Sequence, residues 1–164
     1  MKIALIGMPT SGKSTISKLF DCPVIDVDAL LESQFGCSLQ EYIERFGEAQ
    51  FIEQEEQMLL SCDYPDNCVI STGGSVVYAT AAMLALKQAG VVFVYLQVPL
   101  DALETRLEGQ RNSRGIVMNG AKNWKELLDD RHRLYVEYAD IVINTSGKTP
   151  EMIYKEINAR LAQW

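Results

Sequence analysis

The chain has 164 residues, a length typical of one domain that can bury a core without disulfide bonds. Its 22 acidic and 15 basic residues give a net charge of −7, which argues against nucleic acid or an anionic membrane as the main partner. No apolar run approaches the roughly 20 residues of a membrane span, and the chain begins with strand-forming residues rather than a signal peptide. We therefore expect a single cytoplasmic domain over residues 1–164, a monomer whose partner is a small molecule.

Short apolar runs alternate along the chain with amphipathic segments of helical length. The runs predict strands at residues 2–6, 23–27, 67–71, 91–96 and 140–143. Helix starts agree with this layout, since Ser38 and Glu41 form a capping-box pattern and Thr149 precedes Pro150 as a cap residue before a first-turn proline. This alternation is typical of an α/β fold in which helices cover both faces of a parallel sheet.

The first predicted strand leads directly into GMPTSGKST, which fits the pattern G-x-x-x-x-G-K-[ST]. Gly12 allows a tight turn that points backbone N–H groups at phosphate oxygens, and the helix after it adds the partial positive charge of its N-terminus. Lys13 can reach the β- and γ-phosphates, and the Ser14 hydroxyl can bind Mg²⁺. The alternative is a strand-to-helix turn without a ligand. The context favours a nucleotide site made of Gly7, Pro9, Thr10, Ser11, Gly12, Lys13, Ser14 and Thr15.

The second predicted strand ends in VIDVDALLE, with Asp26 and Asp28 separated by one residue. At a strand end this spacing puts both carboxylates on the same face, which is unfavourable unless a cation or a hydroxyl donor lies beside them. The alternative is that Asp28 caps the next helix while Asp26 is solvated. Because ligands of α/β sheets bind at the carboxyl ends of strands, the nearby phosphate loop favours a role in binding.

The third predicted strand ends in STGG, where Gly73 and Gly74 would let a substrate approach the backbone. A plain turn explains the two glycines equally well. Further along, residues 109–121, GQRNSRGIVMNGA, interrupt the strand–helix alternation with Gly, Asn and Arg. We interpret this stretch as a mobile lid, since sheet-forming sequence resumes after it.

Three further features predict no chemistry. The cysteines lack C-x-x-C spacing, so we expect reduced, mostly buried thiols. The acidic stretch at residues 48–57 is interpreted as a solvated helix face, and His132, the single histidine, as a surface residue of a helix. The four cysteines are Cys22, Cys37, Cys62 and Cys68.

Taken in order, these stretches resemble the shikimate kinase family of small P-loop kinases over nearly the whole chain. The likeness also includes the arginine of SRGIV and the segment DRHRLYVEYAD at residues 130–140. It implies a single-domain P-loop fold with three α/β/α layers, a parallel sheet of strand order 2-3-1-4-5, a closing lid and an acceptor-binding helical region at about residues 29–62. It further implies transfer of the γ-phosphoryl group of ATP, with Mg²⁺, to a hydroxyl of shikimate in aromatic amino acid biosynthesis.

The resemblance also implies a role for each matching residue, coherent with charge-stabilised phosphoryl transfer. Lys13 and Arg114 would neutralise the migrating phosphoryl group, Asp28 would orient and deprotonate the acceptor hydroxyl, and Arg106 would contact the nucleotide. Ser14 would bind Mg²⁺ directly and Asp26 through water. Gly73 and Gly74 would contact the acceptor, and Arg131 would pair with its carboxylate. Without the family likeness, Arg114 and Arg131 would be interpreted as solvated surface charges.

The chain departs from the family pattern on the acceptor side. The family motif F-R-x-x-E has a second arginine that helps to hold the acceptor carboxylate, whereas this chain reads FIEQE, with Ile52 in the arginine position. Ser75 replaces the third glycine of a Gly-Gly-Gly turn, and Gly115 replaces a lid proline. Three hypotheses therefore stand: a shikimate kinase that tolerates Ile52, a kinase of the same fold for another small hydroxylated acceptor, and an ATP-binding module without turnover.

Overall fold

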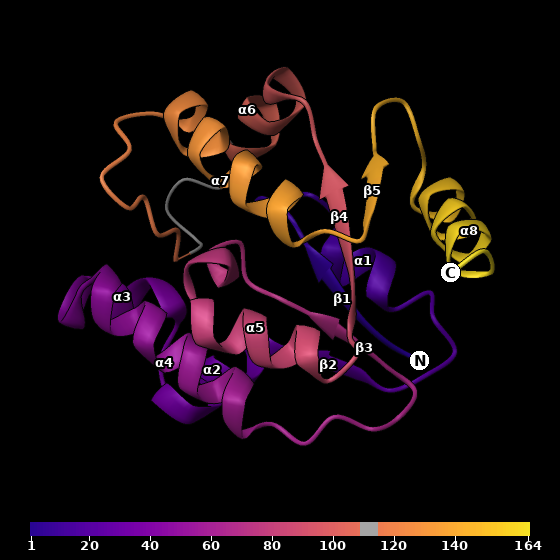
Figure 1. The fold of residues 1–164 in the computed structure, drawn as a ribbon. Coiled ribbons are helices and arrows are strands. Elements are labelled where there is room, and N and C mark those ends of the chain that lie inside the picture. The colour runs from indigo at the N-terminus through magenta and orange to yellow at the C-terminus, as the bar shows by residue number, and fades with distance from the viewer. Residues whose placement is uncertain (109–114) are drawn as a thin grey trace.

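A parallel sheet forms the centre of the fold (Figure 1). The computed structural model describes residues 1–108 and 115–164, and in these ranges the five strands follow the order β2-β3-β1-β4-β5, with parallel pairing throughout. Each predicted strand is present within one or two residues, and the predicted strand order is confirmed. The strands are β1 (Lys2–Ile6), β2 (Val24–Asp26), β3 (Cys68–Ser71), β4 (Val92–Gln97) and β5 (Ile141–Asn144).

Helices cover both faces of the sheet, so the predicted three-layer architecture is confirmed (Figure 1). One face packs against α1 (Lys13–Ser17) and α8 (Pro150–Leu161). The other packs against α2 (Val27–Phe35), α4 (Glu48–Ser61), α5 (Thr80–Gln88) and α7 (Trp124–Tyr138). The remaining elements are α3 (Leu39–Phe46), the short 3₁₀ helix η1 (Val76–Tyr78) and α6 (Leu100–Glu108).

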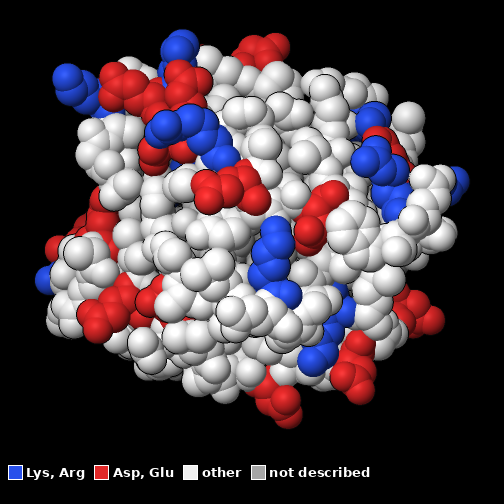
Figure 2. All heavy atoms as spheres, viewed as in Figure 1, with Lys and Arg blue, Asp and Glu red and all other residues white. Residues whose placement is uncertain are grey.

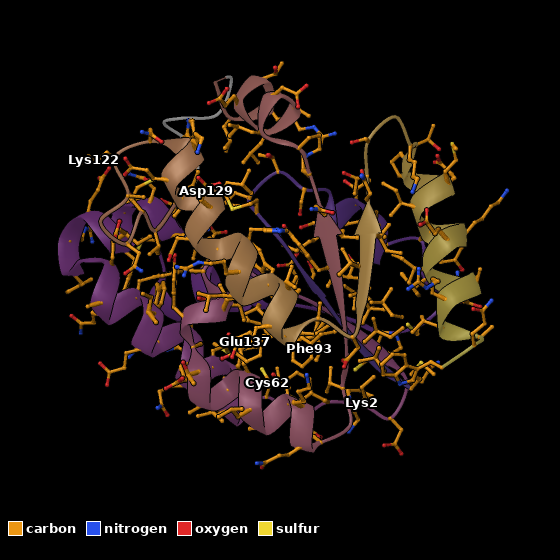
Figure 3. All side chains as sticks on the ribbon, turned by 45° about the horizontal axis from the view of Figure 1, so that its top comes forward. Lys2, Cys62, Phe93, Lys122, Asp129 and Glu137 are labelled. Carbon is orange, nitrogen blue, oxygen red and sulfur yellow. The ribbon has the colours of Figure 1, made fainter. Side chains whose placement is uncertain are left out.

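Side chains of each inner strand alternate between the two cores, as expected for a sheet buried on both faces. In β1, Ile3 and Leu5 belong to the core under α1 and α8, whereas Ala4 and Ile6 belong to the core on the other face. Figure 3 shows α7 lying across the second face, with Asp129 in its first half and Glu137 near its end. The helix thus carries its inward-facing side chains over the sheet and close to the carboxyl ends of the strands.

The predicted helix starts are confirmed. The Ser38 hydroxyl accepts from the Glu41 N–H at 3.2 Å, and the Glu41 carboxylate accepts from the Ser38 N–H at 2.9 Å, which completes the capping box. Thr149 caps α8 through the Met152 N–H, with Pro150 in the first turn. These bonds satisfy N–H groups that have no partner within the helix.

The expectation for the cysteines is only half right. All four thiols are free, and none pairs with another in the part of the chain that the structure describes. Only Cys68, inside β3, is buried, whereas Cys22, Cys37 and Cys62 are partly exposed because they lie in connections or at a helix end. Among the described residues, no helix is long and apolar enough to cross a membrane.

Candidate active site

A cavity of about 480 Å³ opens at the carboxyl ends of β1, β2 and β3. The phosphate loop contributes residues 9–15, α2 contributes carboxylates, and the turn after β3 contributes its glycines. Parallel strands end at the same edge of a sheet, so stretches that are far apart in sequence meet here. Predicted site residues that line the cavity are Pro9, Thr10, Ser11, Gly12, Lys13, Ser14, Thr15, Asp26, Asp28, Gly73, Gly74, Arg106 and Arg131.

The phosphate loop needs its glycines for backbone reasons. Gly12 has φ +97° and precedes α1, a left-handed conformation that side chains rarely adopt. Gly7 has φ +148°, and a Cβ there would lie 2.8 Å from the Leu96 carbonyl oxygen. Gly7 does not line the cavity, but its carbonyl accepts from Lys13, so it supports the loop from behind.

Lys13 is held inside the loop that it belongs to. Its ammonium donates to the carbonyl oxygens of Gly7 at 2.7 Å and Met8 at 2.9 Å, and to the Ser11 hydroxyl at 3.3 Å. The side chain is 7% exposed. On the face in Figure 2, by contrast, Lys and Arg side chains lie among Asp and Glu. A buried cation at the end of the cavity can bind an anion strongly, because charges attract more strongly where the bound anion has displaced water.

The two aspartates line the cavity, but the geometric reason given for them was wrong. We expected both on one face of a strand, whereas β2 ends at Asp26 and α2 begins at Val27, so Asp28 lies in the first turn of a helix. Asp26 is the helix cap: its Oδ1 accepts from the Ala29 N–H at 3.2 Å. The alternative that one aspartate caps the helix is therefore correct, but the cap is Asp26 and not Asp28. Asp28 instead points toward Gly73.

The glycines after β3 are required by close packing. A Cβ on Gly73 would lie 2.5 Å from Oε1 of Glu55 and 2.9 Å from Oδ1 of Asp28. A Cβ on Gly74 would lie 2.7 Å from Cδ of Pro9 and 2.9 Å from Nη1 of Arg131. Side chains at either position would collide with the groups around the cavity, so these glycines do more than form a plain turn.

Arg131 is a buried residue of α7 rather than a solvated surface charge. It is 1% exposed, and its Nη2 donates to the Val117 carbonyl. Its Nε donates to the Tyr78 hydroxyl at 3.4 Å, and the guanidinium lies 5.3 Å from the Tyr78 ring centre. Within the described part of the chain, Nη1 has no hydrogen-bond partner. A buried guanidinium whose Nη1 amino group is unpaired can bind an anionic or carbonyl oxygen.

Of the two arginines predicted to serve the nucleotide and its transferred phosphoryl group, Arg106 and Arg114, only Arg106 is described. It is an exposed residue of α6 that lines the cavity, and its Nη1 donates to the Thr10 carbonyl at 3.1 Å. Arg114 lies outside the described residues, as does the first part of the predicted lid. The second part contacts the acceptor-side helices, because the N–H groups of Met118 and Asn119 donate to the Glu48 carboxylate at 2.7 and 2.8 Å.

Sequence reasoning missed Glu55, which was assigned to a solvated helix face. The helix α4 is not solvated on all sides, because Phe51, Glu55 and Leu59 are buried on its inner side. Glu55 is fully buried, and its Oε2 accepts from the Ser75 hydroxyl at 2.7 Å. Its pKa is raised to about 7, mainly by burial and in part by the charge of Asp28, although the Ser75 hydrogen bond and the charges of Arg131 and Lys13 act to lower it. The inward spacing of residues 51, 55 and 59 was the available signal.

Two tyrosines were also missed. The Tyr135 hydroxyl donates to the Gly74 carbonyl at 2.6 Å, which fixes the glycine turn from the α7 side. Its ring stacks on Tyr95, whose hydroxyl lies 3.1 Å from Nδ1 of His132. His132 is therefore partly buried and hydrogen-bonded, rather than a plain surface residue.

Ile52 takes no part in the cavity lining. Its partly buried side chain packs against the core, and its neighbour Phe51 lines the cavity in its place, together with other apolar residues such as Leu39 and Ile116. The departure from the family motif therefore removes a charged group without placing a new apolar surface in the cavity.

The donors suit a magnesium ion bound together with phosphate. Among the described residues, no cluster of three or more His, Cys, Asp or Glu side chains could hold a metal ion by itself. Ser14 and Asp26 nevertheless line the same cavity as the phosphate loop. Mg²⁺ commonly takes one or two protein oxygens and completes its shell with water and substrate phosphates.

Comparison with known proteins identifies the family. The family model for shikimate kinase matches residues 9–162. Shikimate kinases from Persephonella marina and Thermodesulfovibrio yellowstonii are 32% and 36% identical to this chain, covering 97% and 94% of it and 98% and 91% of their own lengths. Among solved structures, the Aquifex aeolicus shikimate kinase matches with a TM-score of 0.79 at 32% identity, covering 99% of this chain and 96% of its own. The Acinetobacter baumannii enzyme in complex with shikimate matches the fold with a TM-score of 0.86 at 24% identity, covering 99% and 93%. The chain therefore belongs to the shikimate kinase family.

Proposed function

We propose that this protein is a kinase that transfers the γ-phosphoryl group of ATP to a hydroxyl of shikimate in aromatic amino acid biosynthesis. One observation carries the proposal beyond family membership. The buried Arg131, with Nη1 unpaired in the described part of the chain, lines the same cavity as the phosphate loop and Asp28. A single cavity thus has groups that can bind the phosphates of ATP, the attacking hydroxyl of shikimate and the carboxylate of shikimate.

On the nucleotide side, the phosphate loop and Lys13 would hold the β- and γ-phosphates, Arg106 would contact the nucleotide, and Arg114 would join Lys13 in neutralising the migrating phosphoryl group. Mg²⁺, bound by the Ser14 hydroxyl and by Asp26 through water, would supply charge neutralisation of the phosphates. Lys13 would exchange its bonds to the loop carbonyls for bonds to phosphate oxygens. Charge stabilisation by fixed groups is the main source of rate in phosphoryl transfer.

On the acceptor side, Asp28 would orient the attacking hydroxyl and accept its proton. Arg131 would bind the carboxylate, with Gly73 and Gly74 allowing close approach of the ring. Glu55 supports this half from behind, because its Oε1 lies against Gly73 beside Asp28. We further propose that the protein works as a cytoplasmic monomer, as expected from its sequence.

The absence of an arginine at position 52 favours a second candidate, a kinase for a related hydroxylated acceptor that needs a weaker hold on a carboxylate. Ile52 packs against the core and supplies no charge to the cavity. Loss of one charge-assisted hydrogen bond weakens binding by about 1.5–3 kcal/mol when nothing replaces it. A smaller or less acidic acceptor would not depend on that bond.

The test is coupled ADP release with MgATP and shikimate, measured beside quinate, gluconate and simple nucleosides. Shikimate-dependent turnover that disappears in Asp28→Asn supports the proposal. ATP binding without shikimate turnover, but with turnover of another acceptor in the set, favours the second candidate. ATP binding without turnover of any acceptor would favour a nucleotide-binding module and contradict both kinase candidates.

A further inference from the structure

Arg131 is oriented by Tyr78, which does not line the cavity, and by the carbonyl of Val117. Three contacts hold the guanidinium through atoms other than the unpaired Nη1: the Val117 carbonyl at Nη2, the Tyr78 hydroxyl at Nε, and the Tyr78 ring near the guanidinium carbon. A guanidinium is planar, so fixing Nε and Nη2 also fixes the direction of Nη1. The direction in which Arg131 presents its unpaired group is therefore decided by its neighbours.

Tyr78 is in turn oriented by an acidic side chain. Its hydroxyl donates to Oδ2 of Asp130 at 2.6 Å, a short charge-assisted bond. With its proton turned to Asp130, the hydroxyl oxygen presents its lone pairs to Nε of Arg131. Asp130 itself lies 3.4 Å from the Arg133 guanidinium. Burial and the bond to Asp130 raise the Tyr78 pKa, so the hydroxyl keeps its proton.

From this chain of contacts we propose that Tyr78 and Asp130 are positioning residues for acceptor recognition. They hold the Arg131 guanidinium so that Nη1 points into the cavity beside Gly74. Neither residue lines the cavity, so both act through Arg131. The inference rests on the proposed function, because it assigns Arg131 to the acceptor carboxylate. The second candidate uses the same arginine.

The test separates the hydroxyl of Tyr78 from its ring. Tyr78→Phe keeps the ring under the guanidinium and removes the bond to Nε. Losing one such bond should raise the KM for the acceptor by about five- to tenfold, with kcat and the KM for ATP changing by less than about twofold. Asp130→Asn should change the KM in the same direction by about threefold.

A matched control is available in Tyr64→Phe. Tyr64 is also partly buried, and its hydroxyl donates to the Leu59 carbonyl at 2.7 Å, away from the cavity lining. This variant loses the same group from a comparable environment and should leave every kinetic constant unchanged. An equal rise of the acceptor KM in Tyr64→Phe would overturn the positioning role.

A double substitution shows whether Tyr78 acts through Arg131. In an Arg131→Lys background, Tyr78→Phe should change the acceptor KM by less than about twofold, because the group that it orients is already absent. A full five- to tenfold effect in that background would mean that Tyr78 acts independently of Arg131, and the proposal would fail.

The final measurement needs no substrate. In a ¹⁵N–¹H spectrum, the Nε–H signal of Arg131 is assigned by its loss in Arg131→Lys. It should shift in Tyr78→Phe and Asp130→Asn and stay in place in Tyr64→Phe. If the wild-type protein does not phosphorylate shikimate, the proposed function fails while this spectrum still tests the contact. An unshifted signal, or an unchanged acceptor KM in an active Tyr78→Phe enzyme, would reject the positioning role alone.

Discussion

The two halves of the cavity are built in different ways. Most of the nucleotide half comes from one continuous stretch, residues 7–15, in which backbone conformation and Lys13 supply the chemistry, and Arg106 joins it from α6. The acceptor half draws on α2, α4, the turn after β3, and α7, and it depends on side chains that orient one another. A contiguous motif can be identified in a sequence because its geometry is local. A site assembled from distant helices becomes apparent only when the fold brings them together.

The largest effect is expected at the end of the nucleotide half. Lys13→Ala should lower kcat by about 10²–10³-fold, because it removes a preorganised charge from the transferring phosphoryl group. Its partners are loop carbonyls and a hydroxyl, so the fold should survive. Steady-state kinetics and thermal unfolding check both statements. A folded variant with full activity would break the proposed mechanism.

Glu55 allows a test of the acceptor half by pH. Its pKa of about 7 in the folded protein lies above its ordinary value near 4.5, so the folded state binds more protons between these values. Stability therefore falls as pH rises from about 4.5 to 7, by about 3 kcal/mol from this group. This loss should be absent in Glu55→Gln. The free energy of unfolding of the variant should therefore rise relative to that of the wild type as the pH increases from about 4.5 to 7.

Urea unfolding at several pH values from 5 to 8 measures the Glu55 prediction. The control is Glu53→Gln, an exposed position on the same helix. Its difference from the wild type should stay constant with pH. A constant difference in Glu55→Gln as well would show that the buried carboxyl does not titrate in this range.

Arg131→Lys tests whether the acceptor half is separable from the nucleotide half. Lysine keeps the charge but cannot hold the bonds to Tyr78 and Val117 while presenting a third N–H group. The KM for the acceptor should rise by about 30-fold, and the KM for ATP should change little. An equal rise of both constants would show that the two halves respond as one unit.

Among the substitutions at positions 13, 55, 131 and 52, restoring the family arginine at position 52 should have the smallest effect. Ile52→Arg should lower the KM for shikimate by up to about tenfold, because it adds a cation near the acceptor side. The control is Gln57→Arg, an exposed position on α4. If Ile52→Arg leaves the KM unchanged or lowers activity, the acceptor does not use a charge at this position, and the second candidate gains support.

The predictable parts of the molecule are those fixed by neighbours in sequence. The strands, the phosphate loop and the caps at Ser38 and Thr149 follow from local patterns, and the structure has them. The division of roles between Asp26 and Asp28 could not be predicted, because it depends on where β2 stops and α2 begins. The spacing of Phe51, Glu55 and Leu59 on one side of α4 could have indicated that Glu55 turns inward, but its hydrogen bond to Ser75 depends on how the fold brings α4 to the turn after β3.

The bond between Arg131 and the Val117 carbonyl joins the acceptor half to residues 115–119, which Glu48 also holds. If Arg131 binds the acceptor carboxylate as proposed, the position of residues 115–119 and the affinity for the acceptor are thermodynamically coupled. Whatever fixes the segment strengthens acceptor binding by a given factor, and the bound acceptor favours the fixed segment by the same factor. The affinity for the acceptor therefore depends on residues 115–119 as well as on Arg131. A substitution that loosens this segment should weaken acceptor binding even though the segment need not touch the acceptor.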